Sequence, residues 1–275
     1  MKKVEYNLSV PVRGASICYD DCGQGEVPIL FIHGFPFNKS SWAAQIEYLK
    51  KQHRVIAYDI RGFGNSSSGD QEFSIALLAD DLIQFMHQLD LSKAIVCGIS
   101  MGGYILMNAV CRYPEKFKAI ILCDTQCIAD TAAVKDKRTE AIRQIEQGNL
   151  DDFSNQFLDK LFSPKNLELT QASRLAVKHS MVTTAPETVI SALTALKNRD
   201  AICTSLHRIS IPTLIVCGSD DVVTPPQQSE FIHQKIVGSE LYMIDKAGHL
   251  PNIEQSGAFN EAIDQFVSQL IGIPV

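Results

Sequence analysis

The chain has 275 residues, of which 45% are hydrophobic and 20% are charged, so it can form one large domain with an inserted subdomain. This composition excludes disordered and fibrous proteins. The formal net charge is −6 and basic residues occur only in short runs, so nucleic acid and acidic membrane surfaces are not expected partners. The first residues contain no long apolar run, and we expect no signal peptide and no membrane span.

Short apolar runs rich in β-branched residues predict strands that are buried on both faces. These runs span residues 29–32, 55–58, 94–97, 119–123, 213–217 and 241–244. Two earlier segments, 4–10 and 15–20, flank a turn that contains Pro11 and Gly14. They predict an antiparallel hairpin at the edge of the sheet.

Amphipathic segments separate most of these strands and predict helices. In the segment 75–89, apolar residues recur every three or four positions, and Ser74 is placed to cap the helix. Similar patterns cover 42–49, 101–113, 226–236 and 258–270. The regular alternation of strand and helix predicts an α/β fold with a mostly parallel central sheet and helices on both faces.

The alternation stops between residues 128 and 208, where only helical patterns occur, over 131–147, 150–162, 167–179 and 187–197. We therefore expect residues 1–127 and 209–275 to form one core and residues 128–208 to form a helical cap. Ligands of open α/β sheets bind at the carboxyl ends of the strands, so the cap is expected to cover that cleft.

The eight cysteines lie mostly within apolar runs, which favours buried free thiols in a cytoplasmic protein over a disulfide framework. Their spacing also does not predict a metal site, because the close pairs are not combined with histidines. We expect no metal and no cofactor.

The segment 94–103 indicates a nucleophile. Ser100 stands between Gly98 and Gly102, after a predicted strand and before a predicted helix. Such a sharp turn leaves little room for side chains two residues away on either side, and it exposes the serine hydroxyl. A hydroxyl is a weak nucleophile at neutral pH, so this hypothesis requires a base, an acid that orients the base, and donors for an oxyanion.

His249 is the candidate base, because it follows Gly248 in a loop after the last predicted strand. Three aspartates compete for the role of the acid. Asp220 and Asp221 follow the strand at 213–217, and Asp124 follows the strand at 119–123.

With these residues, the sequence resembles the α/β-hydrolase superfamily almost from end to end. The resemblance rests on the segments 31–36 (FIHGFP), 59–66 (DIRGFGNS), 98–103 (GISMGG), the Asp220–Asp221 loop and Gly248–His249, in that order. It implies Asp221 as the acid, since the family's acid usually lies three residues after a glycine and four before a proline. It also implies an oxyanion hole formed by the backbone N–H groups of Phe35 and Met101.

Within the superfamily, the sequence is similar to small carboxylesterases and 3-oxoadipate enol-lactonases. A serine at the turn argues against the dehalogenase and epoxide hydrolase branches, which use an aspartate there. The resemblance implies hydrolysis of a small carboxylic ester or lactone. Perhydrolases (non-haem haloperoxidases), carbon–carbon bond hydrolases and ligand receptors with residual activity remain alternatives.

Several side chains are expected to line the substrate pocket, although core packing explains most of them equally well. They are Gly34, Phe37, Tyr104, Phe157, Leu161 and Leu250. An acidic lactone would also require a cation in the pocket, for which Arg138, Lys160 and Arg174 are candidates, with a solvated surface position as the alternative for each. The oligomeric state cannot be predicted from the sequence.

Overall fold

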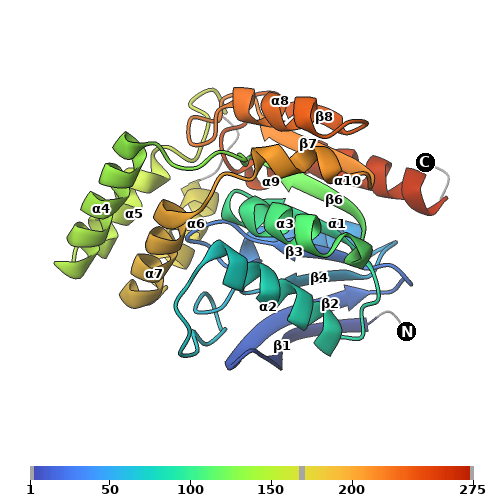
Figure 1. Ribbon diagram of the computed structural model, residues 1–275, viewed down its shortest axis with the longest axis horizontal. Helices are drawn as coiled ribbons and strands as arrows, with labels where there is room; N and C mark the ends of the chain where they lie inside the picture. Colours follow the sequence, from blue (N-terminus) through green and yellow to red (C-terminus); the bar gives the residue numbers. More distant parts are fainter. Residues whose placement is uncertain (1–2, 167–170, 273–275) are drawn as a thin grey trace.

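The protein is built around an eight-stranded sheet (Figure 1). The structure is a computed structural model that describes residues 3–166 and 171–272. Its strands are β1 (Lys3–Val12), β2 (Ala15–Gly23), β3 (Ile29–Ile32), β4 (Val55–Tyr58), β5 (Ala94–Ile99), β6 (Phe117–Cys123), β7 (Thr213–Gly218) and β8 (Glu240–Ile244). Their order is β1-β2-β4-β3-β5-β6-β7-β8. β1 and β2 form the expected edge hairpin, β2 pairs antiparallel with β4, and the remaining pairs are parallel.

Two hydrophobic cores lie on opposite faces of the sheet, because successive side chains of a strand point to opposite faces. In β3, Leu30 and Ile32 belong to one core, whereas Ile29 and Phe31 belong to the other. This double burial explains why these strands consist of continuous apolar runs.

Helices cover both faces (Figure 1). Helices α2 (Ile75–Gln88), α3 (Met101–Arg112) and α8 (Pro226–Lys235) pack into the first core, and α1 (Ala43–Leu49) and α10 (Ser256–Ile271) pack into the second. The hydroxyl of Ser74 accepts a hydrogen bond from the N–H of Leu77 and caps α2, as expected. The structure thereby confirms an α/β fold with a mostly parallel sheet between two layers of helices.

Four helices lie together beyond one end of the sheet, seen at the left of Figure 1. They are α4 (Ala132–Glu146), α5 (Leu150–Leu158), α6 (Gln171–Val182) and α7 (Pro186–Asn198). Helix α5 ends four residues before its predicted end. Tighter turns follow it, in which Leu161 N–H donates to the carbonyl of Leu158. Of the predicted helix 167–179, residues 167–170 lie outside the described residues and the rest belongs to α6.

Strand β8 corrects the expectation that every apolar run is buried on both faces. It is the last strand of the sheet and pairs only with β7, so Tyr242 and Met243 are exposed. A strand at an edge has neighbours on one side only, which an apolar run in the sequence does not reveal.

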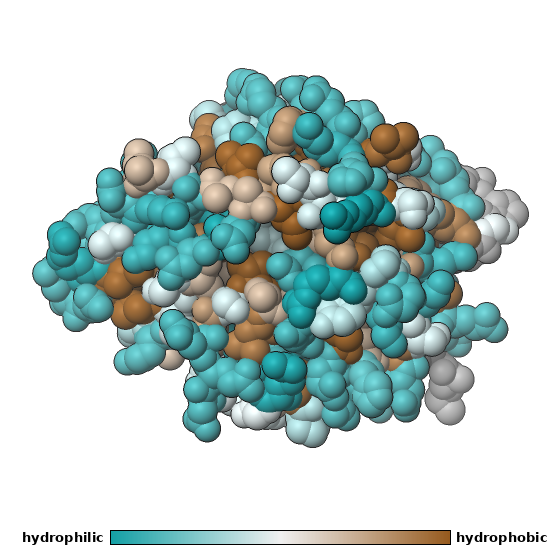
Figure 2. Space-filling view, in the orientation of Figure 1, coloured by the Kyte–Doolittle hydropathy of each residue, from teal (hydrophilic) through white to brown (hydrophobic). Residues whose placement is uncertain are grey.

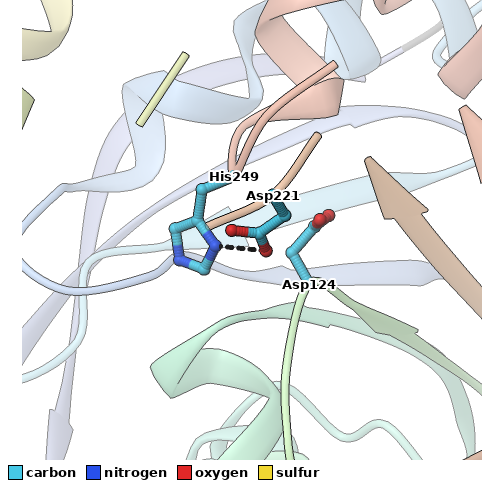
Figure 3. Close-up of side chains that lie close together, drawn as sticks. All are labelled: Asp124, Asp221 and His249. Carbon is cyan, nitrogen blue, oxygen red and sulfur yellow. Dashed lines mark hydrogen bonds and ion pairs between the residues drawn. The ribbon is translucent and has the colours of Figure 1, made fainter. Parts of the chain in front are cut away.

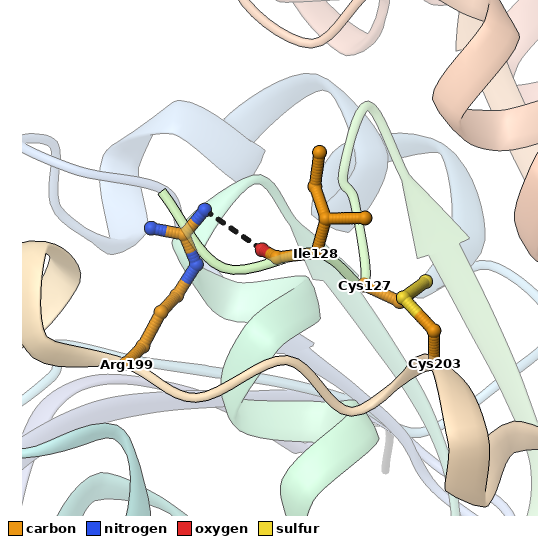
Figure 4. Close-up of a disulfide and its surroundings, with 4 residues drawn as sticks. All are labelled: Cys127, Ile128, Arg199 and Cys203. Atoms are coloured by element: carbon orange, nitrogen blue, oxygen red, sulfur yellow. Dashed lines mark hydrogen bonds between the residues drawn. A yellow bond between two sulfur atoms is a disulfide. The ribbon is translucent and has the colours of Figure 1, made fainter. Parts of the chain in front are cut away.

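The cysteines also differ from the prediction. Cys127 and Cys203 form a disulfide between the loop after β6 and the 3₁₀ helix η3 (Cys203–Arg208), across a sequence separation of 76 residues (Figure 4). Sequence spacing failed here because the two cysteines meet only through the fold. Among the described residues, Cys18, Cys22, Cys97, Cys111, Cys123 and Cys217 are free thiols, as predicted.

The face seen in Figure 2 is mostly hydrophilic, with apolar residues in small groups between hydrophilic ones. Within the described ranges, 3–166 and 171–272, no helix combines the length and the apolar character needed to cross a bilayer.

Candidate active site

Ser100 follows β5 directly and stands at the N-terminus of α3 with φ 53° and ψ −114°. This backbone conformation is unfavourable for a residue with a side chain, and such strain persists where the surrounding structure enforces it. Two hydrogen bonds fix the turn to the neighbouring strand. Ser100 N–H donates to the carbonyl of Cys123 at 2.9 Å, and the hydroxyl of Thr125 donates to the carbonyl of Ser100 at 2.9 Å.

The glycines around Ser100 are required by close backbone contacts. A Cβ atom on Gly98 would overlap the carbonyl oxygen of Gly102, and one on Gly102 would lie 2.8 Å from the carbonyl oxygen of His33. Strand β5, helix α3 and the loop after β3 therefore meet at distances that a side chain would prevent.

The candidate acid and base lie at the same end of the sheet as Ser100, because each follows a parallel strand. Asp221 follows β7 and His249 follows β8. Oδ2 of Asp221 and Nδ1 of His249 are 2.8 Å apart, and both side chains are fully buried (Figure 3). Nε2 of His249 is buried, and none of the residues in the described ranges forms a hydrogen bond with it. This nitrogen is thus available to accept a proton.

Four hydrogen bonds hold the carboxylate of Asp221. Its Oδ1 accepts from the N–H groups of Val223 (2.7 Å) and Thr224 (3.1 Å), and its Oδ2 accepts from the Thr224 hydroxyl (2.7 Å) as well as from His249. Burial raises the pKa of Asp221, but His249, Thr224 and Val223 outweigh this effect and lower the pKa below its ordinary value. Asp221 is therefore ionised at neutral pH. Thr224 was not singled out in the sequence.

The other two aspartates are placed differently. Asp220 points away from the pair, since its carboxylate accepts hydrogen bonds from the Ser163 hydroxyl and the ammonium group of Lys165. Asp124 lies beside the pair (Figure 3). One oxygen of Asp124, one of Asp221 and one ring nitrogen of His249 all lie within 4.8 Å of one another.

Those three side chains are also close enough to share a metal ion, and they form the one such group among the described residues. A hydrogen bond already joins Asp221 to Nδ1 of His249. A metal ion bound between these two atoms would have to displace the proton that this hydrogen bond requires. The arrangement accordingly fits an acid–base pair better than a metal centre.

The loop after β3 carries the candidate oxyanion donors. A Cβ atom on Gly34 would lie 3.2 Å from Cβ of Ser100, so the loop passes directly against the serine. His33 braces it, because Nε2 accepts from Ile60 N–H at 2.9 Å and Nδ1 lies 2.9 Å from the Gly34 carbonyl. Burial lowers the pKa of His33 to about 4, so this histidine is neutral. Met101 is the first residue of α3, where a helix leaves N–H groups without partners in the helix.

Glu254 is a second residue that sequence reasoning missed. It is 8% exposed, in the short helix α9 (Pro251–Glu254). Its two oxygens accept hydrogen bonds from Gly248 N–H (2.6 Å) and Ser163 N–H (2.8 Å). His249 N–H in turn donates to the carbonyl of Leu161 at 2.7 Å. These contacts fix the loop of His249 to the segment after α5. In the sequence, Glu254 is marked only as a single acidic residue shortly after the loop of His249, and this is not enough to predict its role.

The residues expected to line one pocket lie in different places. Phe35 and Phe157 line a cavity of about 500 Å³ between α4, α5 and the loop of Asp221. Phe37 lines a separate cavity of about 330 Å³, and Tyr104 lines another of about 460 Å³, next to Arg199. Gly34 lies against Ser100 as described above. The last two residues, Leu161 and Leu250, are fully buried.

The three candidate cations do not lie at one site either. Arg138 and Lys160 line the cavity of Phe35 together with Lys137, which was not predicted. Arg138 is paired with Asp130 at 2.6 Å. Arg174 instead stacks on Phe162, with its guanidinium carbon 5.0 Å from the ring centroid.

Comparison with known proteins gives the same fold. A family model described as alpha/beta hydrolase fold matches residues 27–256. The chain is 31% identical to 3-oxoadipate enol-lactonase 2 of Acinetobacter baylyi over 96% of this chain and 97% of that protein. It is 29% identical to a putative non-heme chloroperoxidase of Synechocystis, over 91% and 94% of the two chains. A thermophilic esterase from Thermogutta terrifontis superposes with a TM-score of 0.89 at 27% identity, over 98% of this chain and 99% of the esterase. The chain therefore belongs to the α/β-hydrolase family.

Proposed function

We propose that the protein is a serine hydrolase that cleaves a small carboxylic ester or lactone through an acyl-enzyme intermediate. Its relatives identify it as a carboxylic ester hydrolase. The observation that carries the proposed mechanism is the buried hydrogen bond between Asp221 and His249, which leaves Nε2 of His249 open at the end of the sheet where Ser100 is held in a strained turn.

The chemistry follows from these positions. Nε2 of His249 removes the proton from Oγ of Ser100 while Oγ attacks the carbonyl carbon of the substrate. Asp221 keeps the Nδ1 proton in place and stabilises the imidazolium that forms. The backbone N–H groups of Phe35 and Met101 stabilise the oxyanion, and each donor of this kind contributes about 3 kcal/mol in the transition state.

The intermediate then collapses. The bond between the carbonyl carbon and the alcohol oxygen breaks, and His249 gives its proton to that oxygen, which leaves Ser100 acylated. A water molecule, deprotonated by His249, attacks the acyl group and releases the acid. In a lactone the alcohol stays attached to the acyl chain, so one ring-opened hydroxy acid is the product.

The cavity beside Phe35 favours an anionic substrate. Lys137 and Lys160 supply positive charge to its lining, whereas Arg138 is paired with Asp130 and Glu140 is paired with Arg143. A substrate carboxylate bound there would meet a net positive charge. We therefore propose lactones and esters that carry a second acid group, of which the enol-lactone of 3-oxoadipate named for the relative is one.

We also propose that residues 128–208 act as the substrate-selecting cap of a core formed by 1–127 and 209–275. A cytoplasmic location stays a prediction. The Cys127–Cys203 disulfide is a feature more common in oxidising compartments, so the redox state of these cysteines in cells is a direct test.

The first experiment compares the wild type with Ser100→Ala on a graded series of p-nitrophenyl esters and on neutral and acidic lactones. We expect turnover that depends on Ser100, with acidic lactones preferred. Equal hydrolysis by purified Ser100→Ala would overturn the nucleophile assignment. A stable acyl adduct without turnover would indicate a receptor, and peroxide-dependent halogenation faster than ester hydrolysis would indicate a perhydrolase.

A further inference from the structure

Asp124 is a buried carboxyl group that the proposed mechanism does not use. Its side chain is fully buried, directly after β6. Oδ1 accepts a hydrogen bond from Gly218 N–H at 2.9 Å. Oδ2 is also buried, but within the described part of the chain it has no hydrogen-bond donor. A buried carboxylate oxygen without a donor is costly, whereas the same oxygen with a proton can itself donate.

The titratable groups that face Asp124 are the carboxylate of Asp221, the ring of His249 and the thiols of Cys123 and Cys217. Of these, the negative charge of Asp221 favours the protonated form of Asp124 most strongly. Burial and the charge of Asp221 raise the pKa of Asp124 well above its ordinary value. Two buried carboxyl groups this close do not both ionise readily, and one proton is retained between them.

The hydrogen bonds decide which of the two carries the proton. Asp221 accepts four hydrogen bonds and faces the imidazole ring, so its ionised form is stabilised. Asp124 accepts one. This difference favours the proton on Asp124, on the oxygen that has no donor, and an oxygen of Asp221 lies within 4.8 Å of an oxygen of Asp124.

We propose that Asp124 is a positioning residue that donates a hydrogen bond from Oδ2 to the carboxylate of Asp221. This bond keeps the carboxylate in the orientation in which it accepts from Nδ1 of His249. This proposal rests on the proposed function of the pair. Asp124 itself remains neutral, and it neither exchanges protons with the substrate nor replaces Asp221 as the counter-ion of His249.

Two substitutions at the same site test the proposal. Asp124→Asn retains an acceptor for Gly218 N–H and a neutral donor toward Asp221, so we expect kcat within about threefold of the wild type. Asp124→Leu has the same branched arrangement of heavy atoms, but it has no donor for Asp221 and no acceptor for Gly218 N–H, so we expect kcat to fall about tenfold or more, with KM changed less. Asp220→Asn, on the side of the loop that faces Ser163 and Lys165, is the matched control and should retain wild-type kcat.

The pH dependence of kcat/KM distinguishes a neutral, positioning Asp124 from an ionised Asp124 that acts through its charge. If Asp124 were ionised, Asp124→Asn would remove a negative charge near His249 and shift the acid limb of kcat/KM downward by about two pH units. We expect the acid limbs of the wild type and of Asp124→Asn to coincide. A large downward shift, or a loss of kcat in Asp124→Asn equal to that in Asp221→Asn, would overturn the proposal.

Infrared difference spectroscopy gives a result that does not depend on catalysis or on the stability of the leucine variant. At pH 7 the wild-type spectrum should contain the carbonyl band of a protonated carboxylic acid that is lost in Asp124→Asn and kept in Asp220→Asn. An unchanged band in Asp124→Asn would overturn the inference even if activity depends on Ser100. Conversely, activity independent of Ser100 would overturn the proposed function while leaving the protonation of Asp124 open to this measurement.

Discussion

Oδ2 of Asp221 lies 2.8 Å from Nδ1 of His249, while Oδ1 of the same carboxylate accepts two backbone N–H groups at 2.7 and 3.1 Å. The carboxylate is thus fixed at both oxygens, and the imidazole ring is oriented by an acid that cannot rotate away. The two residues lie 28 positions apart in the sequence, and they meet because β7 and β8 are neighbouring strands.

Asp221→Asn should lower kcat by up to about 10⁴-fold, the loss known for the corresponding change in a serine protease triad. The backbone donors at Oδ1 hold the acceptor side of the new amide, so its NH₂ group must face Nδ1 of His249 and impose the wrong tautomer. Steady-state kinetics on the best ester or lactone measures the loss. Asp220→Asn serves as the control, and a reversed order of the two effects would assign the acid to Asp220.

Protein stability should report the lowered pKa of Asp221. A carboxyl group with a lowered pKa in the folded state stabilises the fold above its unfolded pKa of about 3.9, and this contribution disappears as the pH falls through the folded pKa. The wild type should therefore exceed Asp221→Asn in unfolding free energy at pH 6 to 7, and the difference should shrink below about pH 4. Urea titrations across this range measure it. A difference that grows on acidification would contradict the sign.

Thr224→Val should lower kcat about tenfold, because it removes a hydrogen bond to a charged group without changing the side-chain shape. The hydroxyl donates to Oδ2 of Asp221 at 2.7 Å, the same oxygen that faces His249. Thr224→Ser retains the hydroxyl and should restore most of the activity. Equal rates for the valine and serine variants would show that the hydroxyl does not orient the carboxylate.

Glu254→Gln should reduce the unfolding free energy by about 1–3 kcal/mol, because one of two buried N–H groups loses its acceptor. The same change should lower kcat, since Gly248 precedes His249. Thermal unfolding and kinetics measure the two effects. Glu261→Gln, at an exposed position of α10, is the control and should change neither.

Cys127→Ser should destabilise the oxidised protein by about 2–4 kcal/mol, because the disulfide closes a long segment of chain. The bond joins the loop after β6 to η3, beside Arg199, whose guanidinium donates to the carbonyl of Ile128 (Figure 4). A reducing agent should lower the melting temperature of the wild type toward that of the variant. Cys111→Ser, at a free thiol, retains the disulfide, so it should keep the melting temperature of the wild type and respond to the reducing agent as the wild type does. A wild type insensitive to reduction would show that the bond contributes no stability.

The strands, the helices and the turn at Ser100 could be predicted from the sequence because their signals are local. Apolar periodicity specifies which faces of a strand or helix are buried, and Gly98 and Gly102 mark a place where backbones approach too closely for side chains. The order of Ser100, Asp221 and His249 along the chain, together with the resemblance to a known family, was sufficient to propose the chemistry.

Contacts between distant segments were decided only by the tertiary structure. The sequence left Asp124 as one of three possible acids, and packing of β6 against β7 placed it beside Asp221. Glu254 and Ser163 are 91 positions apart, and Cys127 and Cys203 are 76 apart, so no local pattern joins either pair. Likewise, the side chains expected in one pocket are divided among several cavities. Local sequence determines which elements form and which residue types they carry, whereas the neighbours of a buried polar group depend on how the elements pack.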